Sequence, residues 1–285
     1  MLSKKYSTRV VVKNETMIIL NKHQLITEQF PNGETKVKDF DQWIKADNLL
    51  EFTYQEDGDL IRLFFVKKRL EEAGASCKLW IRYMPYSRMD RKIEGDLFTL
   101  KYVAAFINSL QFDKVYVVEP HSETTLTLLE NSVAIYPALD WLPKLMEKLE
   151  FSDNDRIVFP DKGAAARYLN SGYEDACVFE KQRNPQTGRI EAMKLKTGNI
   201  VKGAKCIIVD DLCSAGGTFL WAGKILKEMG ASEIYLLVTH CEPRIFKGTL
   251  LEEDSPIDLV FTTDSMMNTT HPKLNYINLT TESYV

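Results

Sequence analysis

The sequence predicts an α/β protein built on mostly parallel sheets. Short apolar, β-branched runs recur along the chain, helical patterns separate them, and polar clusters follow five of the runs. The clearest run, 207–209, suits a strand that is covered on both faces. Asp210, Asp211, a small-residue turn and a helical pattern over 219–229 follow it, with Gly230 as a stop signal. Ligands bind at the carboxyl ends of strands in open parallel sheets, so we expect a functional site there.

The composition is ordinary for a soluble globular protein. The 285 residues include 27% charged and 45% hydrophobic side chains, and this length allows one large or two medium domains. A net charge of −4 gives no electrostatic reason to expect a nucleic-acid partner. We find no apolar run of membrane-spanning length, no signal-peptide pattern at the N-terminus, and no zinc-type spacing among the five cysteines. We therefore expect a cytoplasmic protein with reduced thiols and no membrane partner.

In the first half, strands, helices and loops should alternate. The expected strands are 10–12, 17–20, 78–83 and 115–118. The expected helices are 60–74, 98–110 and 140–149, and the expected loops are 30–34 and 85–92. A domain boundary near residue 145 would give an N-terminal α/β domain of residues 1–145 and a C-terminal α/β domain of residues 146–285.

The second half repeats this alternation. The expected strands are 156–159, 176–179, 207–209, 233–239 and 259–262, and small residues at 164–166 open a helix. The segment 180–189 is charged and rich in turn residues, so nothing in it buries well. We expect a mobile loop or flap there. His240 should lie at the tip of the strand 233–239.

Three clusters have residue types that suit phosphate and sugar chemistry. The 214–218 turn feeds a helix N-terminus, whose N–H groups can bind a phosphate, while Asp210 and Asp211 suit ribose hydroxyls or a metal ion. A plain capped turn explains the same pattern without a ligand. His121, Glu119 and Asp161 offer oxygen and imidazole ligands for Mg²⁺, although lone histidines are more often structural. Lys181 and Arg183 can close over a transferring phosphoryl group, or they can be a solvated charge pair.

Six segments, in the right order from about residue 30 to 264, resemble the ribose-phosphate diphosphokinases, also called phosphoribosyl pyrophosphate synthetases. They are Phe30-Pro31-Asn32-Gly33-Glu34, Pro85 to Arg91, Glu119-Pro120-His121, Pro160 to Arg167, Lys181-Gln182-Arg183 and Cys206 to Thr218. The resemblance implies two phosphoribosyltransferase-like α/β domains, each a mostly parallel sheet flanked by helices. It also implies transfer of the β,γ-diphosphate of Mg·ATP to the 1-hydroxyl of a ribose-5-phosphate-type acceptor, with release of AMP.

The resemblance also implies a role for each matching residue. The ATP-binding positions are Phe30, Asn32, Glu34, Arg88 and Asp90, of which the first three contact adenine on a neighbouring subunit, so that the enzyme is at least a dimer. The Mg²⁺ positions are His121, Glu119 and Asp161. The catalytic positions are Lys181 and Arg183. The ribose-phosphate positions are Asp161, Asp210, Asp211, Ser214, Ala215, Gly216, Gly217 and Thr218.

The chain departs from the family pattern inside the phosphate-binding turn. Ser214 and Ala215 stand where the family has Asp and Thr, which removes polar contacts and leaves room. Met89, Glu119 and Ala164 replace a Gln, an Asp and a Gly. The acceptor is then either ribose 5-phosphate, with the changes tolerated by the glycine backbone, or a 5-substituted sugar such as ADP-ribose.

Two further classes of function remain open at this point. A non-catalytic, nucleotide-binding regulator would not need the Lys181 and Arg183 pair. A simple phosphoribosyltransferase would not need the segments around Phe30 and Arg88.

Overall fold

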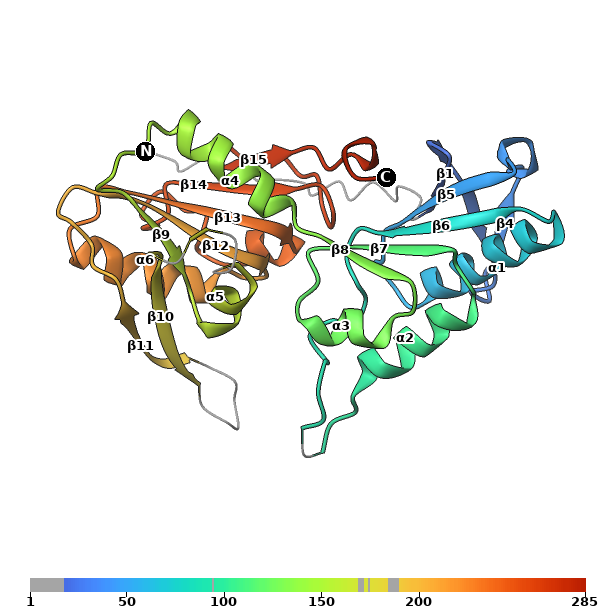
Figure 1. Cartoon of the computed structure of the whole chain (residues 1–285), viewed down its shortest axis with the longest axis horizontal. Helices are drawn as coiled ribbons and strands as arrows, with labels where there is room; N and C mark the ends of the chain where they lie inside the picture. The colour runs from blue at the N-terminus through green and yellow to red at the C-terminus, as the bar shows by residue number, and fades with distance from the viewer. Residues whose placement is uncertain (1–17, 94, 169–171, 174, 184–189) are drawn as a thin grey trace, which may run out of the picture.

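The computed structural model describes residues 18–93, 95–168, 172–173, 175–183 and 190–285. Two sheets with flanking helices lie side by side (Figure 1). Most neighbouring strands are parallel, which confirms the predicted α/β class. The strand predicted at 10–12 lies outside the described residues.

The first sheet has the strand order β2-β1-β5-β6-β7-β8, in which β5 to β8 are parallel and β1 is antiparallel to its neighbours. Its strands are β1 (Ile18–Leu20), β2 (His23–Gln24), β5 (Asp47–Phe52), β6 (Ser76–Ile81), β7 (Lys114–Val118) and β8 (Ser132–Ile135). A separate antiparallel hairpin consists of β3 (Ile26–Gln29) and β4 (Thr35–Lys38). The helices of this half are α1 (Gly58–Glu72), α2 (Thr99–Ser109) and α3 (Glu123–Leu128), with a 3₁₀ turn at Asp41–Trp43.

Apolar spacing explains why these helices pack on the first sheet. Leu63, Val66 and Leu70 of α1 are fully buried and recur at helical spacing on one face. They share one core cluster with Leu50 of β5 and Leu79 of β6. Figure 1 shows α1, α2 and α3 together on the same side of the sheet.

The second sheet has the order β11-β10-β9-β12-β13-β14-β15, and β11 alone is antiparallel to its neighbour. Its strands are β9 (Arg156–Phe159), β10 (Cys177–Arg183), β11 (Ile190–Thr197), β12 (Lys205–Cys213), β13 (Glu233–Cys241), β14 (Leu259–Thr263) and β15 (Leu274–Ile277). The helices are α4 (Pro137–Lys148), α5 (Lys162–Tyr168) and α6 (Gly217–Glu228), with 3₁₀ turns at Pro243–Lys247 and Thr281–Ser283.

The central strands of the second sheet are covered on both faces, as the apolar runs predict. Ile208 packs in one cluster with Ala222 and Leu226 of α6. Val209, on the opposite face of β12, packs in another cluster with Trp141 of α4. The predicted boundary at residue 145 therefore falls inside a helix that packs on the second sheet, and the division into two domains stays a prediction.

Several predicted elements differ from the structure. Residues 180–183 belong to β10 and pair with β11 in an antiparallel hairpin, so the prediction of a loop across 180–189 is wrong for this part. Met193, which lies opposite Lys181, is buried in the core and packs the hairpin against the second half of the chain.

The strands β12 and β13 are also longer than predicted. Backbone pairing continues as far as Cys213 opposite Cys241, so Asp210 and Asp211 lie within β12 and His240 lies within β13. The backbone hydrogen bonds between β12 and β13 continue to this end of the strands, and they keep these polar residues in an extended conformation.

Contacts between distant segments join the two halves. Arg82, after β6, bonds Asp264, after β14, at 2.5 Å. Tyr284 near the C-terminus lies 5.8 Å from the ring of Trp80 on β6 and donates a hydrogen bond to Asp140 on α4.

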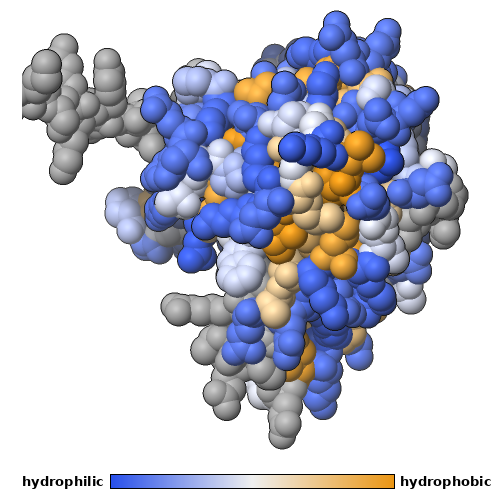
Figure 2. Space-filling model, turned by 90° about the vertical axis from the view of Figure 1, so that its left-hand side faces the viewer, coloured by the Kyte–Doolittle hydropathy of each residue, from blue (hydrophilic) through white to orange (hydrophobic). Residues whose placement is uncertain are grey.

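The surface at one end of the molecule is mainly polar. Figure 2 shows the end of the molecule formed by the second sheet, where hydrophilic residues surround a central hydrophobic patch. Within the described residues, no helix combines the length and the apolar character that crossing a membrane requires. All five cysteines lie in this described part, where each is buried and none forms a disulfide.

Candidate functional site

A cavity of about 1200 Å³ lies where the strand ends of the second sheet face the loops after β6 and β7. It brings together twelve of the residues that the sequence singled out. These are Arg88, Asp90, His121, Asp161, Lys181, Asp210, Asp211, Ser214, Ala215, Gly216, Gly217 and Thr218. The remaining predicted residues are Phe30, Asn32, Glu34, Glu119 and Arg183, and they are considered below.

The 214–218 turn has a backbone conformation that requires glycine. Gly216 has φ +84°, and a Cβ atom there would lie 2.9 Å from the Leu250 side chain. Gly217 opens α6, and a Cβ atom there would meet nothing within 4 Å. Gly217 and Thr218, at the start of this twelve-residue helix, line the cavity, and the N–H groups at a helix N-terminus can bind a phosphate.

A buried arginine joins the two aspartates to the first half of the chain. The Arg167 guanidinium lies 3.2 Å from Asp211 and 3.4 Å from Asp210, and it donates to the His121 carbonyl at 2.6 Å. The His121 ring bonds Asp211 at 2.6 Å between Nδ1 and Oδ2. These contacts hold the loop after β7 against the end of β12.

The same contacts make the two aspartates different. Burial alone would raise the pKa of Asp211, but the hydrogen bond from His121 and the charge of Arg167 outweigh it and hold this pKa below its ordinary value. Burial, and next the charge of Asp211, raise the pKa of Asp210 well above its ordinary value. The two neighbouring carboxyl groups thus differ in how readily they ionise, and both can hydrogen-bond neighbouring hydroxyl groups.

Lys181 lies over the start of α5. Its ammonium group forms an ion pair with Asp161, whose carboxylate also accepts the Ala164 N–H at 2.9 Å. Burial would raise the pKa of Asp161, but the charge of Lys181 outweighs it and lowers this pKa. Arg183 lies two residues further along and is the last residue of β10. The hairpin therefore carries a cation to the cavity wall.

Glu119 lies beneath the cavity instead of on its wall. The residue is only 2% exposed and has φ +42°. Its carboxylate accepts hydrogen bonds from Tyr168 at 2.6 Å and from Thr239 at 2.8 Å, and burial raises its pKa to about 7. The metal-binding role of Glu119 stays a prediction. In the structure, its hydrogen bonds with Tyr168 and Thr239 connect the first half of the chain to the second.

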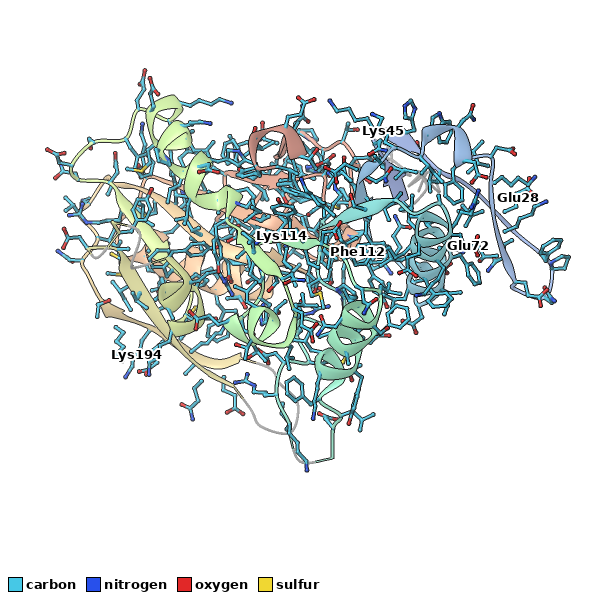
Figure 3. All side chains as sticks on the ribbon, turned by 45° about the vertical axis from the view of Figure 1, so that its right-hand side comes forward. Glu28, Lys45, Glu72, Phe112, Lys114 and Lys194 are labelled. Atoms are coloured by element: carbon cyan, nitrogen blue, oxygen red, sulfur yellow. The ribbon has the colours of Figure 1, made fainter. Side chains whose placement is uncertain are left out.

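The residues expected to contact adenine lie outside this cavity. Phe30, Asn32 and Glu34 occupy the exposed turn between β3 and β4, where the Asn32 amide bonds Glu34 at 2.9 Å. Figure 3 shows Glu28, on the same hairpin, at the opposite edge of the molecule from Lys194 on β11. No residue of this turn lines the cavity of its own chain.

The residues on the cavity wall are compatible with Mg²⁺. His121 and Asp161 provide imidazole and carboxylate donors. Among the described residues, no cluster of three or more His, Cys, Asp or Glu side chains is arranged to hold a metal alone. Mg²⁺ commonly takes one or two protein ligands together with substrate phosphates, so this donor set suits it.

Four further residues matter in the structure but received no role from the sequence. Arg167, Trp221 and Arg244 line the cavity, and Glu242 bonds two of its wall residues. Arg167 ends one of the six matching segments, which was a usable signal. Trp221 lies in a helical pattern and Glu242 follows a strand, where neither residue type is unusual.

Acidification should destabilise the protein through His240. Its Nε2 donates to the Val118 carbonyl at 3.2 Å, its Nδ1 bonds Ser265 at 2.8 Å, and burial lowers its pKa to about 4. The unfolded chain binds a proton near pH 6.5 and the folded chain only near pH 4, so stability should fall between these values by about 3 kcal/mol. Glu119, with its raised pKa, acts in the opposite direction over part of this range.

The variant His240→Gln isolates this contribution. The free energy of unfolding is measured with urea at intervals from pH 7 to pH 4. As the pH falls, wild type should lose more stability than the variant, so the variant should become the more stable of the two relative to its value at pH 7. Parallel curves would show that His240 does not contribute in this way.

Comparisons with known proteins agree with the geometry. Residues 163–281 match the family model described as the phosphoribosyl synthetase-associated domain. A ribose-phosphate pyrophosphokinase of Pyrococcus abyssi is 32% identical over 223 residues, which cover 75% of this chain and 74% of the relative. The corresponding protein of Methanothermobacter thermautotrophicus is 28% identical over 248 residues, which cover 84% of each chain.

The fold has a solved counterpart. The phosphoribosylpyrophosphate synthetase of Mycobacterium smegmatis superposes with a TM-score of 0.73 over 89% of this chain and 85% of that one, at 22% identity. The sequence relatives extend this likeness from fold to family. The chain belongs to the family of ribose-phosphate pyrophosphokinases and is a diphosphokinase-type transferase.

Proposed function

We propose that the cavity transfers the β,γ-diphosphate of Mg·ATP to the 1-hydroxyl of ribose 5-phosphate, giving phosphoribosyl pyrophosphate and AMP. One observation supports this reaction most strongly: a backbone phosphate site, two aspartates and the cations Arg88 and Lys181 all line a single cavity. Incubation with Mg·ATP and ribose 5-phosphate should release AMP in amounts equal to the sugar 1-diphosphate formed. Release of ADP would contradict the proposal.

The chain positions both substrates for this reaction. The 5-phosphate binds the 214–218 turn, the ribose hydroxyls bind Asp210 and Asp211, and Arg88 binds the triphosphate. The 1-oxygen attacks the β-phosphorus and a new O–P bond forms. The bond from the β-phosphorus to the AMP oxygen breaks, AMP leaves as an anion, and the proton of the 1-hydroxyl passes to solvent. Lys181 and Arg183 stabilise the charge that develops on the transferring group.

Mg²⁺ would bind at His121 and Asp161 together with substrate oxygens, and when bound it would neutralise phosphate charge. The free, buried thiols agree with a reducing compartment, so we place the reaction in the cytoplasm.

A second acceptor is favoured by one feature of the cavity wall. Trp221, one turn into α6 from Gly217, is 44% exposed and lines the cavity together with Arg244. An acceptor with a nucleoside beyond its 5-phosphate, such as ADP-ribose, can stack its base on this indole and place its second phosphate near Arg244.

Truncating Trp221 should separate the two acceptors. Trp221→Ala should lower kcat/KM for ADP-ribose by about tenfold or more, since stacking on a base contributes about 1–3 kcal/mol. The value for ribose 5-phosphate should change by less than about twofold. AMP release with each acceptor measures both values.

A matched control for this test is Tyr102→Ala, which removes another exposed aromatic side chain from a helix outside the cavity. This variant should keep both activities. If wild type shows no preference for ADP-ribose over ribose 5-phosphate, ribose 5-phosphate remains the acceptor.

The active form should be at least a dimer. Phe30, Asn32 and Glu34 are exposed and do not line their own cavity, so they would complete a neighbour's site. A triple alanine variant at these positions and the variant Lys181→Ala should each be inactive at low ATP concentration, yet a mixture of the two should regain activity in hybrid sites. Sedimentation showing an active monomer would rule this arrangement out.

A further inference from the structure

Glu242 connects the two predicted substrate sites. It follows β13 directly, and its side chain is 17% exposed. Arg88 donates to one carboxylate oxygen at 2.6 Å, and the Ser214 hydroxyl donates to the other at 2.5 Å. Arg88 belongs to the loop after β6, whereas Ser214 is the first residue of the 214–218 turn. A single carboxylate is therefore shared by the triphosphate side and the 5-phosphate side of the cavity.

The backbone of Glu242 is fixed on the second sheet. Its N–H donates to the Cys213 carbonyl at 2.8 Å, and its own carbonyl accepts the Ile245 N–H at 3.0 Å. The side chain of Arg88 is 51% exposed, which makes it the partner that is free to move. If the Arg88 guanidinium moves away, the Glu242 carboxylate stays beside the 214–218 turn and keeps its hydrogen bond from Ser214.

We propose that Glu242 is a positioning residue that makes the donor and the acceptor weaken each other's binding. The inference rests on the proposed function only in that Arg88 binds a triphosphate and the 214–218 turn binds a 5-phosphate. No diphosphate needs to be transferred for the effect to exist.

The effect follows from the charges. Without nucleotide, Arg88 neutralises Glu242 next to the turn. A triphosphate carries more negative charge than one carboxylate and draws the guanidinium away. The uncompensated carboxylate then repels the acceptor phosphate across the short length of the turn. By linkage, the acceptor weakens nucleotide binding by the same factor.

Ser214 adds a second consequence. Its hydroxyl is committed to Glu242, so it is not directed to the acceptor phosphate. The substitution Glu242→Gln removes the negative charge and keeps the shape of the side chain. Because the repulsion of the acceptor phosphate is then absent, this variant should bind the acceptor more tightly, and nucleotide should no longer weaken that binding.

The test is a binding measurement on the full chain with Mg²⁺. Calorimetry with ribose 5-phosphate, and separately with ADP-ribose, is performed with and without saturating α,β-methylene ATP, which cannot transfer its diphosphate. In wild type, the nucleotide should raise the Kd of at least one acceptor by about fivefold or more. In Glu242→Gln, the ratio of the two Kd values should fall below about twofold.

Two variants sharpen the result. Ser214→Ala removes the hydroxyl but keeps the Arg88–Glu242 pair, so it should keep the antagonism. Glu253→Gln removes an exposed carboxylate from the segment after the 3₁₀ turn at Pro243–Lys247. This control variant should bind the nucleotide and the acceptor as wild type does.

Three outcomes would overturn the inference: wild type without any antagonism, Glu242→Gln with undiminished antagonism, or Ser214→Ala losing it to the same extent. An enzyme that transfers no diphosphate but shows the predicted ratios would contradict the proposed function alone.

Discussion

Replacing Lys181 by alanine should lower kcat by about 10²- to 10³-fold and leave the Kd of ATP within about threefold. Lys181 projects from β10 to the cavity wall, where it pairs with Asp161. Cations placed where charge develops act mainly in the transition state, so their removal reduces turnover more than ground-state binding. Single-turnover AMP release and nucleotide titration measure the two quantities separately.

Lys194 provides a matched control. It is an exposed lysine on β11, lies opposite Glu180, and does not line the cavity (Figure 3). Lys194→Ala should keep wild-type turnover. A Lys181→Ala enzyme with normal kcat would refute the catalytic role of Lys181.

Replacing Arg167 by alanine should lower the free energy of unfolding by about 3–5 kcal/mol at pH 7 and abolish activity. The guanidinium is 8% exposed and contacts Asp210, Asp211 and the His121 carbonyl. Its removal leaves buried carboxylates without their cation, and the cost of an unpaired buried charge is of this size. The loop after β7 also loses the hydrogen bonds through which Arg167 connects the His121 carbonyl to Asp211 on β12.

Chemical unfolding of the wild type and of Arg167→Ala measures the loss. Arg69 is the comparison, because it pairs with Asp41 on the surface, and such pairs contribute little. Arg69→Ala should unfold at the wild-type midpoint within error. Equal stability of Arg167→Ala and wild type would mean that the aspartates do not depend on Arg167.

The sequence predicts the centre of each sheet better than the edges. The run at 206–209 has β-branched residues buried on both faces, and this pattern is typical of a parallel strand. The hairpin of β10 and β11 is charged along much of its length, so local patterning indicates a loop. Its pairing depends on the burial of Met193 against residues distant in sequence, which no local pattern reports.

The candidate site was predictable as far as its residues follow strands. Polar residues near the carboxyl ends of parallel strands meet at one edge of a sheet, which explains why Asp161 and Asp211 line one cavity. His121 follows a strand of the first sheet and reaches the same cavity because the two halves meet there. The sequence could not show which way each side chain turns. Glu119 precedes His121 by two residues, yet its carboxylate points into the protein and bonds Tyr168.

The contacts between the halves were beyond sequence reasoning. Arg88 and Glu242 are 154 residues apart, and nothing in either local pattern indicates that they meet. Such contacts depend on how the loops of the first sheet meet the strand ends of the second.

The most direct measurement of the proposed reaction follows the β-phosphorus of ATP. With ATP labelled at that atom, Mg²⁺ and either acceptor, the label should appear in a sugar 1-diphosphate, and the AMP released should be unlabelled. Label recovered in ADP or in free phosphate, with no labelled sugar, would contradict diphosphoryl transfer by this cavity.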